Sequence, residues 1–222
     1  MDGKRNIGKK RNILFDLDGT IIEPKEGLTK AVQFSLESFG IYVEDRDTLT
    51  PFIGPPLRDS FKKYYGLNDE EVELAIKKFR EYFAPKGVYE NVLYDGIVDL
   101  FEELKTAGKQ LIIATSKPTV FAETILNYHN IRDYFVFVAG SELNEKRSRK
   151  GEVIRYALES MKITELQSTI MIGDREHDVI GAREMGLECI GVCYGYGSLK
   201  ELEDAGATYI ARDVEELSRL LR

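Results

Sequence analysis

The sequence lacks four features that would each assign it to a particular class of protein. It has no run of about 18 apolar residues, so no membrane span is expected. The N-terminus has no apolar segment of the kind found in secretory signal peptides. Cys189 and Cys193 are the only cysteines, too few for a disulfide framework, and internal repeats are missing as well. A cytoplasmic enzyme fits all of these absences.

An excess of basic residues is also missing. The formal net charge is −7 at pH 7 and no basic patch stands out, so we do not expect a nucleic acid as partner. A membrane is not expected as partner either, because no apolar run is long enough to span one. Apolar residues make up 43% of the 222 residues. This is enough to form one substantial core, or a core with a small insert. A monomer is the default expectation.

Short apolar runs that alternate with helical patterns predict a doubly wound α/β protein with a mostly parallel sheet. Amphipathic stripes between these runs have the spacing of helices, as at residues 97–104 and 153–161. In such a sheet, ligands bind at the carboxyl ends of the strands. Strands are expected at residues 13–15, 111–114, 136–138, 169–172, 189–192 and 209–210.

One region interrupts the alternation. Between about residues 23 and 89 no convincing strand is found, and apolar residues recur at helical spacing. We therefore expect a core of residues 1–22 and 90–222, with residues 23–89 as an all-helical insert directly after the first strand. Within it, Gly54 begins a Gly-Pro-Pro loop of unusual shape, which we expect to face the active site. Arg58 is either a ligand for an anionic substrate group or a solvated helix residue.

The most informative stretch is an apolar run that ends in two aspartates, Asp16 and Asp18, followed by Gly19. Because side chains alternate along an extended segment, the two carboxylates point the same way. Their repulsion would be offset by a hard cation such as Mg²⁺, bound through oxygen atoms. The backbone at Gly19 can approach a phosphate closely because no Cβ interferes. The sequence thus predicts a Mg²⁺ site at the end of the first strand.

Polar residues also follow later strands of the predicted sheet. They are Thr115 and Ser116, then Lys150 at the start of a helix, then Asp174 and Asp178. In a doubly wound sheet these ends can converge on the first strand, and the converged set suits phosphoryl transfer. One carboxylate can attack phosphorus to form an aspartyl-phosphate, and a second can protonate the leaving alcohol and later deprotonate water. Thr115 and Lys150 can hold phosphate oxygens, and Asp174 can complete the Mg²⁺ shell.

Four motifs in the same order resemble those of the haloacid dehalogenase superfamily of aspartate-nucleophile phosphatases. The resemblance covers nearly the whole chain and implies a Rossmann-like core with a helical type-1 cap, the insert. Two further segments, residues 52–57 and 195–198, are similar to its phosphoglycolate-phosphatase-like branch. The four motifs are residues 16–20, Thr115, Lys150, and Gly173-Asp174 together with Asp178.

The resemblance implies a role for each of these residues. Asp16 would be the nucleophile and Asp18 the general acid and base. Mg²⁺ would be held by Asp16, the backbone carbonyl of Asp18, and Asp174. Asp178 would support the metal shell or orient Lys150. Thr115, Ser116 and Lys150 would bind the transferring phosphate.

One residue departs from the pattern of the superfamily. Many relatives have proline after the third-motif lysine, whereas Gly151 follows Lys150 here. Lys117, which lies beside Thr115, is therefore the alternative phosphate lysine. Arg175 could reach the substrate or pair with a nearby carboxylate, and His177 is expected to orient other groups or lie at the surface.

The expected function is hydrolysis of a small phosphomonoester, such as phosphoglycolate or a nucleoside monophosphate, by a Mg²⁺-dependent phosphatase. A sugar phosphomutase of the same superfamily shares the aspartyl-phosphate step and is the first alternative. A catalytically idle phosphate-binding module is the second. Asp18 argues against a dehalogenase, because carbon–halogen cleavage needs no proton at that position. A closing cap disfavours protein-bound phosphotyrosine, which is too large.

Overall fold

The core of the protein is a parallel sheet of six strands, seen in a computed structural model that describes residues 7–144 and 146–222. The strand order is β5-β4-β1-β6-β7-β8, and every neighbouring pair is parallel. All six predicted strands are confirmed. Their bounds are β1 (Asn12–Phe15), β4 (Gln110–Pro118), β5 (Phe135–Ser141), β6 (Thr169–Gly173), β7 (Glu188–Val192) and β8 (Tyr209–Ala211).

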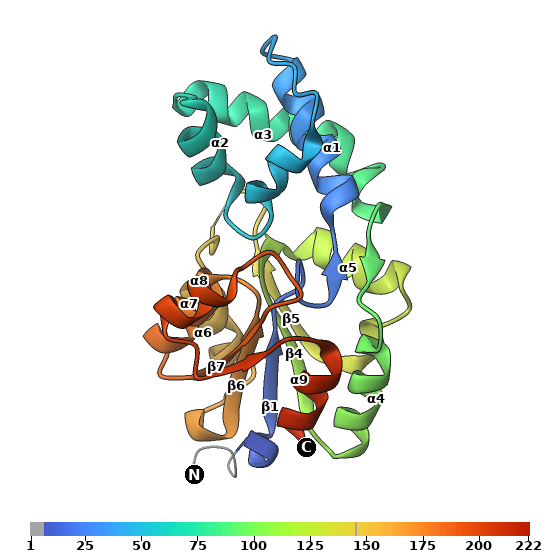
Figure 1. The fold of residues 1–222 in the computed structure, drawn as a ribbon, viewed down its shortest axis with the longest axis vertical. Coiled ribbons are helices and arrows are strands. Elements are labelled where there is room, and N and C mark those ends of the chain that lie inside the picture. The colour runs from blue at the N-terminus through green and yellow to red at the C-terminus, as the bar shows by residue number, and fades with distance from the viewer. Residues whose placement is uncertain (1–6, 145) are drawn as a thin grey trace.

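Helices cover both faces of this sheet, as the doubly wound fold requires (Figure 1). Successive residues of β1 face opposite sides: Ile13 and Phe15 join one buried cluster and Leu14 joins the other. The first cluster includes residues of α4 (Ile97–Thr106), α5 (Thr119–Tyr128) and α9 (Val214–Leu221). The second includes residues of α6 (Lys150–Ser160), α7 (Glu176–Glu184) and α8 (Leu199–Ala205). Short 3₁₀ helices span Ile7–Lys9, Arg132–Tyr134 and Leu166–Ser168.

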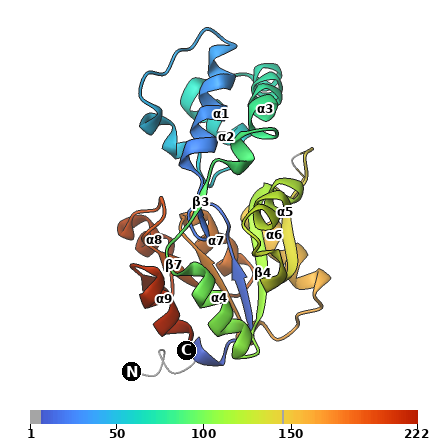
Figure 2. The same ribbon diagram turned by 90° about the vertical axis from the view of Figure 1, so that its right-hand side faces the viewer.

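A helical insert stands above the carboxyl edge of the sheet (Figure 2). The chain enters it through β2 (Ile22–Glu23) and returns through β3 (Val92–Leu93), and these two strands pair antiparallel. Between them lie only helices among the described residues, as predicted. The predicted boundaries at residues 23 and 89 lie in or next to this strand pair, and the division into two domains stays a prediction. The helices are α1 (Lys25–Glu37), α2 (Leu57–Tyr65), α3 (Asp69–Phe83), and the 3₁₀ helices Arg46–Phe52 and Gly87–Tyr89.

Local sequence signals explain why α3 begins and lies where it does. The Asn68 side chain accepts a hydrogen bond from the Glu71 backbone N–H, and the Glu71 carboxylate accepts one from the Asn68 N–H. This reciprocal cap satisfies two backbone donors at the helix start. The apolar stripe of α3 packs on α1, where the Ser35 hydroxyl donates to the Ala75 carbonyl at 2.7 Å.

None of the helices within residues 7–144 and 146–222 combines the length and the apolar character that a membrane span requires.

Candidate active site

Neighbouring strands bring the predicted site residues together at one edge of the sheet. Asp16 follows β1 directly, and its backbone N–H still donates to the Ile172 carbonyl of β6 at 2.9 Å. Thr115 lies in β4, on the other side of β1, and Asp174 follows β6. The carboxyl ends of the central strands therefore converge, as the sequence predicted.

The Lys150 ammonium lies between two carboxylates. Its Nζ is 2.7 Å from Oδ1 of Asp16 and 2.8 Å from Oδ1 of Asp178, and it donates to the Ala114 carbonyl at 2.9 Å. The side chains of the three charged residues are at most 5% exposed. Burial works against the charged ammonium, but the two carboxylates outweigh it and raise the pKa of Lys150 above its usual value. Lys150 therefore stays charged beside Asp16.

Glycine at position 151 fits the packing of α6 on α7. The two helices touch at Gly151 and Gly181, where a Cβ on Gly181 would lie 2.8 Å from the Gly151 nitrogen and 3.0 Å from the Lys150 Cβ. This close approach carries the first residue of α6 to Asp178 in α7.

Lys117 occupies a different place from Lys150. Its Nζ is 2.8 Å from Oδ2 of Asp18, and both side chains are at most 10% exposed. Burial raises the pKa of Asp18, while the charge and hydrogen bond of Lys117 oppose this rise. The other oxygen, Oδ1, is buried and has no hydrogen-bond partner among the described residues. The structure thus gives each of the two aspartates its own lysine.

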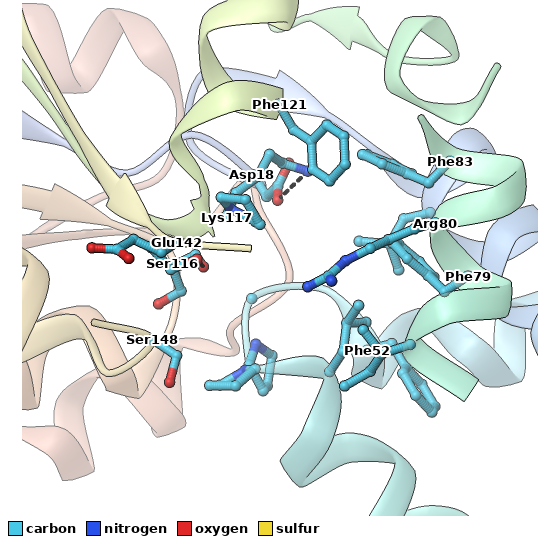
Figure 3. A pocket seen from close by; sticks show the side chains of 18 residues that line it. Asp18, Phe52, Phe79, Arg80, Phe83, Ser116, Lys117, Phe121, Glu142 and Ser148 are labelled. Carbon is cyan, nitrogen blue, oxygen red and sulfur yellow. Dashed lines mark hydrogen bonds and ion pairs between the residues drawn. The ribbon is translucent and has the colours of Figure 1, made fainter. Parts of the chain in front are cut away.

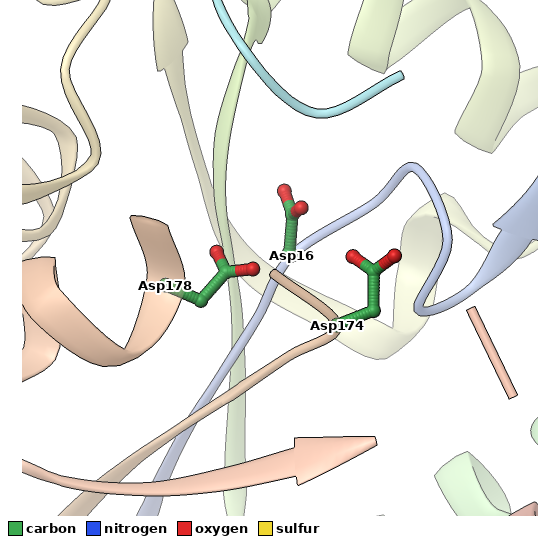
Figure 4. Close-up of side chains that lie close together, drawn as sticks. All are labelled: Asp16, Asp174 and Asp178. Atoms are coloured by element: carbon green, nitrogen blue, oxygen red, sulfur yellow. The ribbon is translucent and has the colours of Figure 1, made fainter. Parts of the chain in front are cut away.

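Three buried carboxylates gather at the edge of the sheet (Figure 4). One oxygen from each of Asp16, Asp174 and Asp178 lies within 4.8 Å of the others. Burial, followed by repulsion from Asp178 and Asp16, raises the pKa of Asp174 well above its usual value. Burial also raises the pKa of Asp178 to about 6, although Lys150 opposes this.

This cluster has the properties of a cation site. Oδ2 of Asp174 accepts a hydrogen bond from the Tyr196 N–H at 2.7 Å, whereas its Oδ1 is buried without a partner in the described part of the chain. Hard cations such as Mg²⁺ bind carboxylate oxygens and would offset the mutual repulsion. The carboxylate of Asp18, which pairs with Lys117, lies outside the cluster.

Glycine is required at position 19. Its φ is +78°, and a Cβ there would lie 2.2 Å from Oδ2 of Asp174. Any side chain would therefore displace the Asp174 carboxylate of the cluster. The predicted phosphate ligands lie close by: Thr115 is buried and its Oγ1 accepts from the Lys117 N–H at 3.2 Å. The Ser116 carbonyl accepts from the Ser141 hydroxyl at 2.8 Å.

A cavity that is partly open to solvent lies between the insert and the core (Figure 3). Asp18, Ser116 and Lys117 line the side of the core, and Gly54 lines the side of the insert, as predicted. Arg58 is not among the described lining residues. It forms ion pairs with Glu73 and Asp69 of α3. The cavity is also lined by four residues that were not among the predicted site residues: Phe79, Arg80, Phe83 and Phe121.

Arg175 connects the core to the insert. Its Nε is 2.8 Å from Oε1 of Glu201, and its Nη1 donates to the Ile53 carbonyl at 2.8 Å. The second contact reaches the loop that holds Gly54. His177 lines a separate cavity beside Lys150 and lies outside the carboxylate cluster. Of the two roles left open for Arg175, pairing with a carboxylate is the one seen.

Comparisons with known proteins identify the family of the chain. Residues 13–192 match the family described as haloacid dehalogenase-like hydrolase. A 5′-nucleotidase of Pseudomonas aeruginosa is 43% identical over 210 residues, 95% of each chain. The tyrosine-protein kinase PtkA of Mycobacterium tuberculosis is 33% identical over 211 residues, which is 94% of this chain and 72% of PtkA.

A solved structure resembles both the core and the insert. The crystal structure of a predicted phosphatase from Clostridium acetobutylicum superposes with a TM-score of 0.93 at 50% identity and covers 95% of this chain and 97% of that one. The family match, the sequence relatives and the fold all indicate the same family. The chain belongs to the haloacid dehalogenase-like hydrolases and is an enzyme of their phosphatase type.

Proposed function

We propose that the protein is a Mg²⁺-dependent phosphatase that hydrolyses a small phosphomonoester through an aspartyl-phosphate on Asp16. The observation that supports this most is the separate pairing of two neighbouring carboxylates. Asp16 lies against Lys150, and Asp18 lies against Lys117 with a raised pKa. Two carboxyl groups in different environments can take different roles, one as nucleophile and one as acid.

The two steps follow from these positions. A carboxylate oxygen of Asp16 attacks phosphorus, the bond from phosphorus to the leaving oxygen breaks, and Asp18 gives its proton to that oxygen. Water then attacks the phosphorus of the aspartyl-phosphate, the bond from phosphorus to the Asp16 oxygen breaks, and Asp18 takes the proton that the water loses, so that inorganic phosphate and the free Asp16 carboxylate result. Lys150, Thr115 and Ser116 hold phosphoryl oxygens through both steps.

Asp16, Asp174 and Asp178 would hold the Mg²⁺ ion together with the backbone carbonyl of Asp18. The unpartnered Oδ1 of Asp174 supports this assignment. When bound, the ion supplies positive charge that offsets the charge of the phosphoryl oxygens. The chain's own contribution is to hold one oxygen of each of the three carboxylates within 4.8 Å of the others.

The helical insert acts as a cap in this proposal. It encloses the cavity beside Asp18 and would exclude bulk water while the aspartyl-phosphate forms. A small metabolite fits this enclosure better than a phosphorylated protein does. The relative named 5′-nucleotidase and the resemblance to phosphoglycolate phosphatases make nucleoside monophosphates and phosphoglycolate the first candidates.

The test is phosphate release from a panel of phosphomonoesters, with Mg²⁺ and with a chelator. The panel contains nucleoside monophosphates, phosphoglycolate, sugar phosphates and phosphotyrosine. We expect Mg²⁺-dependent release that Asp16→Asn abolishes. Asp99→Asn removes an exposed carboxylate from α4 and serves as the matched control, with activity unchanged.

Two other outcomes would overturn the proposal. Isomerisation of a sugar phosphate without net phosphate release would identify a phosphomutase. Neither release nor isomerisation from any compound, with phosphate still bound, would identify a binding module.

A further inference from the structure

One loop of the core, residues 194–197, lies between the carboxylate cluster and the insert. It belongs to the connection from β7 to α8, at the carboxyl edge of the sheet (Figure 1). The proposed reaction uses none of its residues. The loop nevertheless contacts Asp174 of the cluster with its backbone, and it contacts the chain that leaves the core with its tyrosine side chains. It therefore joins two parts of the enzyme that have different tasks.

The backbone of the loop lies directly on Asp174. The Tyr196 N–H donates to Oδ2 of Asp174 at 2.7 Å. A Cβ on Gly195 would lie 2.4 Å from the same oxygen, and a Cβ on Gly197 would lie 1.9 Å from the Asp174 carbonyl oxygen. The loop can approach this closely only because both positions are glycine. Since the loop holds Oδ2, the oxygen left for a cation is Oδ1, which is buried without a partner in the described part of the chain.

The two tyrosine side chains of the loop hold the chain where it crosses between core and insert. The Tyr196 hydroxyl donates to Oε1 of Glu23, the last residue of β2. The Tyr194 hydroxyl donates to the Thr20 carbonyl at 3.0 Å. The ring of Tyr194 also meets the ring of Tyr94, which follows β3, with centroids 4.9 Å apart. The same loop thus contacts both the outgoing and the returning chain.

Glu23 extends this contact into the insert. Its Oε1 also accepts a hydrogen bond at 2.8 Å from the backbone N–H of Lys25, the first residue of α1. Tyr196 and Glu23 are therefore the two residues that connect Asp174 to α1. A shift of α1 relative to the core would displace Tyr196, whose N–H sets the orientation of the Asp174 carboxylate.

We propose that Tyr196 is a positioning residue, which holds Asp174 in the orientation that binds the cation and couples that orientation to the position of β2 and α1. This inference rests on the proposed function, because it takes the carboxylate cluster as the Mg²⁺ site. Groups that orient metal ligands typically change metal affinity by roughly 10–100-fold when they are substituted. Because coupling between two sites is reciprocal, Mg²⁺ in turn stabilises β2 and the start of α1.

The first test is Tyr196→Phe, which removes only the hydroxyl that reaches Glu23. We expect the Kd for Mg²⁺, measured by isothermal titration calorimetry without substrate, to rise by about tenfold. The matched control is Tyr134→Phe, which removes a hydroxyl that donates to Glu102 at the surface of the core. It should leave the Kd for Mg²⁺ unchanged.

Amide hydrogen exchange tests the coupling to the insert. In the wild type, saturating Mg²⁺ should slow exchange in residues 22–28 by about fivefold. In Tyr196→Phe, saturating Mg²⁺ should no longer slow exchange there. A residue that only stabilised the fold would change exchange equally with and without Mg²⁺.

Substitutions of Glu23 test whether it acts together with Tyr196. Glu23→Leu leaves no acceptor for the Tyr196 hydroxyl, so it should raise the Kd for Mg²⁺ as much as Tyr196→Phe does. The double variant should raise it no further, because the two residues form one contact. Glu23→Gln keeps an oxygen that can accept this bond and should change the Kd by less than about twofold.

The outcomes distinguish this inference from the function on which it rests. Equal Mg²⁺ affinity in the wild type and Tyr196→Phe would overturn the positioning role while the phosphatase stands. Additive effects of Tyr196→Phe and Glu23→Leu would overturn the coupling to the insert. If the wild type itself binds no Mg²⁺, the proposed metal site fails and the positioning role fails with it.

Discussion

The two ends of the cavity are equally buried and chemically opposite. At the core end, Asp18 and Lys117 are no more than 9% exposed, and both side chains are ionisable. At the insert end, Phe52, Phe79 and Phe83 are at most 5% exposed and have no ionisable group. Burying charge costs free energy unless each charge has a partner, whereas burying aromatic rings is favourable.

This contrast separates two tasks. The core end holds each carboxylate in a fixed relation to a lysine or to another carboxylate, which serves any phosphate ester. The insert end contributes a shaped apolar lining, which would act on the rest of the substrate. A substitution at the core end should therefore lower activity toward all substrates alike. A substitution at the insert end should change the activity toward one substrate relative to another.

The largest effect is expected from Lys150→Met. It leaves Asp16 and Asp178 buried without their shared cation, which should lower the free energy of unfolding by about 3 kcal/mol. Activity should fall by about 10³-fold for AMP and ribose 5-phosphate equally, because a phosphate-binding donor is lost. Phosphate release at saturating Mg²⁺ and chemical denaturation measure the two effects.

Lys200→Met is the control for this experiment, since Lys200 is 82% exposed and pairs with Asp204 at the surface. Its effect on stability should be within about 1 kcal/mol. A Lys150→Met variant that lost activity toward one substrate alone would break the separation of tasks between the two ends.

An intermediate effect is expected from Lys117→Met, at the boundary between the ends. Lys117 holds the pKa of Asp18 below the value that burial alone would give, so its loss should raise that pKa further. The limb of the pH–rate profile that reports Asp18 should then move to higher pH, and kcat should fall by about tenfold or more.

The matched control is Lys105→Met. Lys105 also lies over an aromatic ring, 5.3 Å from the centroid of Tyr134, but in an exposed part of the core. It should change neither kcat nor the pH profile. A Lys117→Met variant with an unshifted profile would show that Asp18 is not the group that titrates.

The smallest effect is expected from Arg175→Met. This substitution removes a contact between the core and the insert that lies outside the cavity. Losing the bond to the Ile53 carbonyl should raise KM about fivefold for every substrate, because the loop at Gly54 is held less firmly. Amide hydrogen exchange in residues 53–57 should become faster. Glu201→Gln is the control, because it keeps the contact of Arg175 with the Ile53 carbonyl. It should change the rate of amide hydrogen exchange in residues 53–57 far less than Arg175→Met does.

The core could be predicted well from the sequence for a simple reason. Central parallel strands are buried on both faces, so each reads as a continuous apolar run, as Ile13–Phe15 does. The strands β2 and β3 were missed because two residues are too few to show a period. The helical insert was recognised because three stripes of apolar residues recur at helical spacing.

The site could be predicted in part. Asp16, Asp18 and Asp174 stand at strand ends, where the sequence alone fixes their position in the sheet. The choice between Lys150 and Lys117 could not be made, because the reach of Lys150 depends on how closely α6 packs on α7. Each lysine proves to have its own aspartate.

The insert was the hardest part to interpret. Phe79 and Phe83 fit a helical stripe, and such a stripe looks the same whether it packs inside the insert or lines a cavity. Arg58 was a candidate ligand, but the packing of α2 on α3 places it beside Glu73 and Asp69. Arg80, the cationic side chain of α3 that lines the cavity, follows Phe79 in the sequence and lies outside the apolar stripe, so nothing in the pattern marked it.

The two short strands β2 and β3 have a consequence for how such an enzyme can diverge. The chain leaves the core and returns to it at one place, where Ile22 pairs with Leu93. The strands of the six-stranded sheet all lie outside the insert between β2 and β3, and so do the hydrogen bonds that join them. Exchange of the segment between these strands would leave the six-stranded sheet and its carboxylate cluster intact, so a lineage could inherit one chemistry and acquire a new substrate with each new insert.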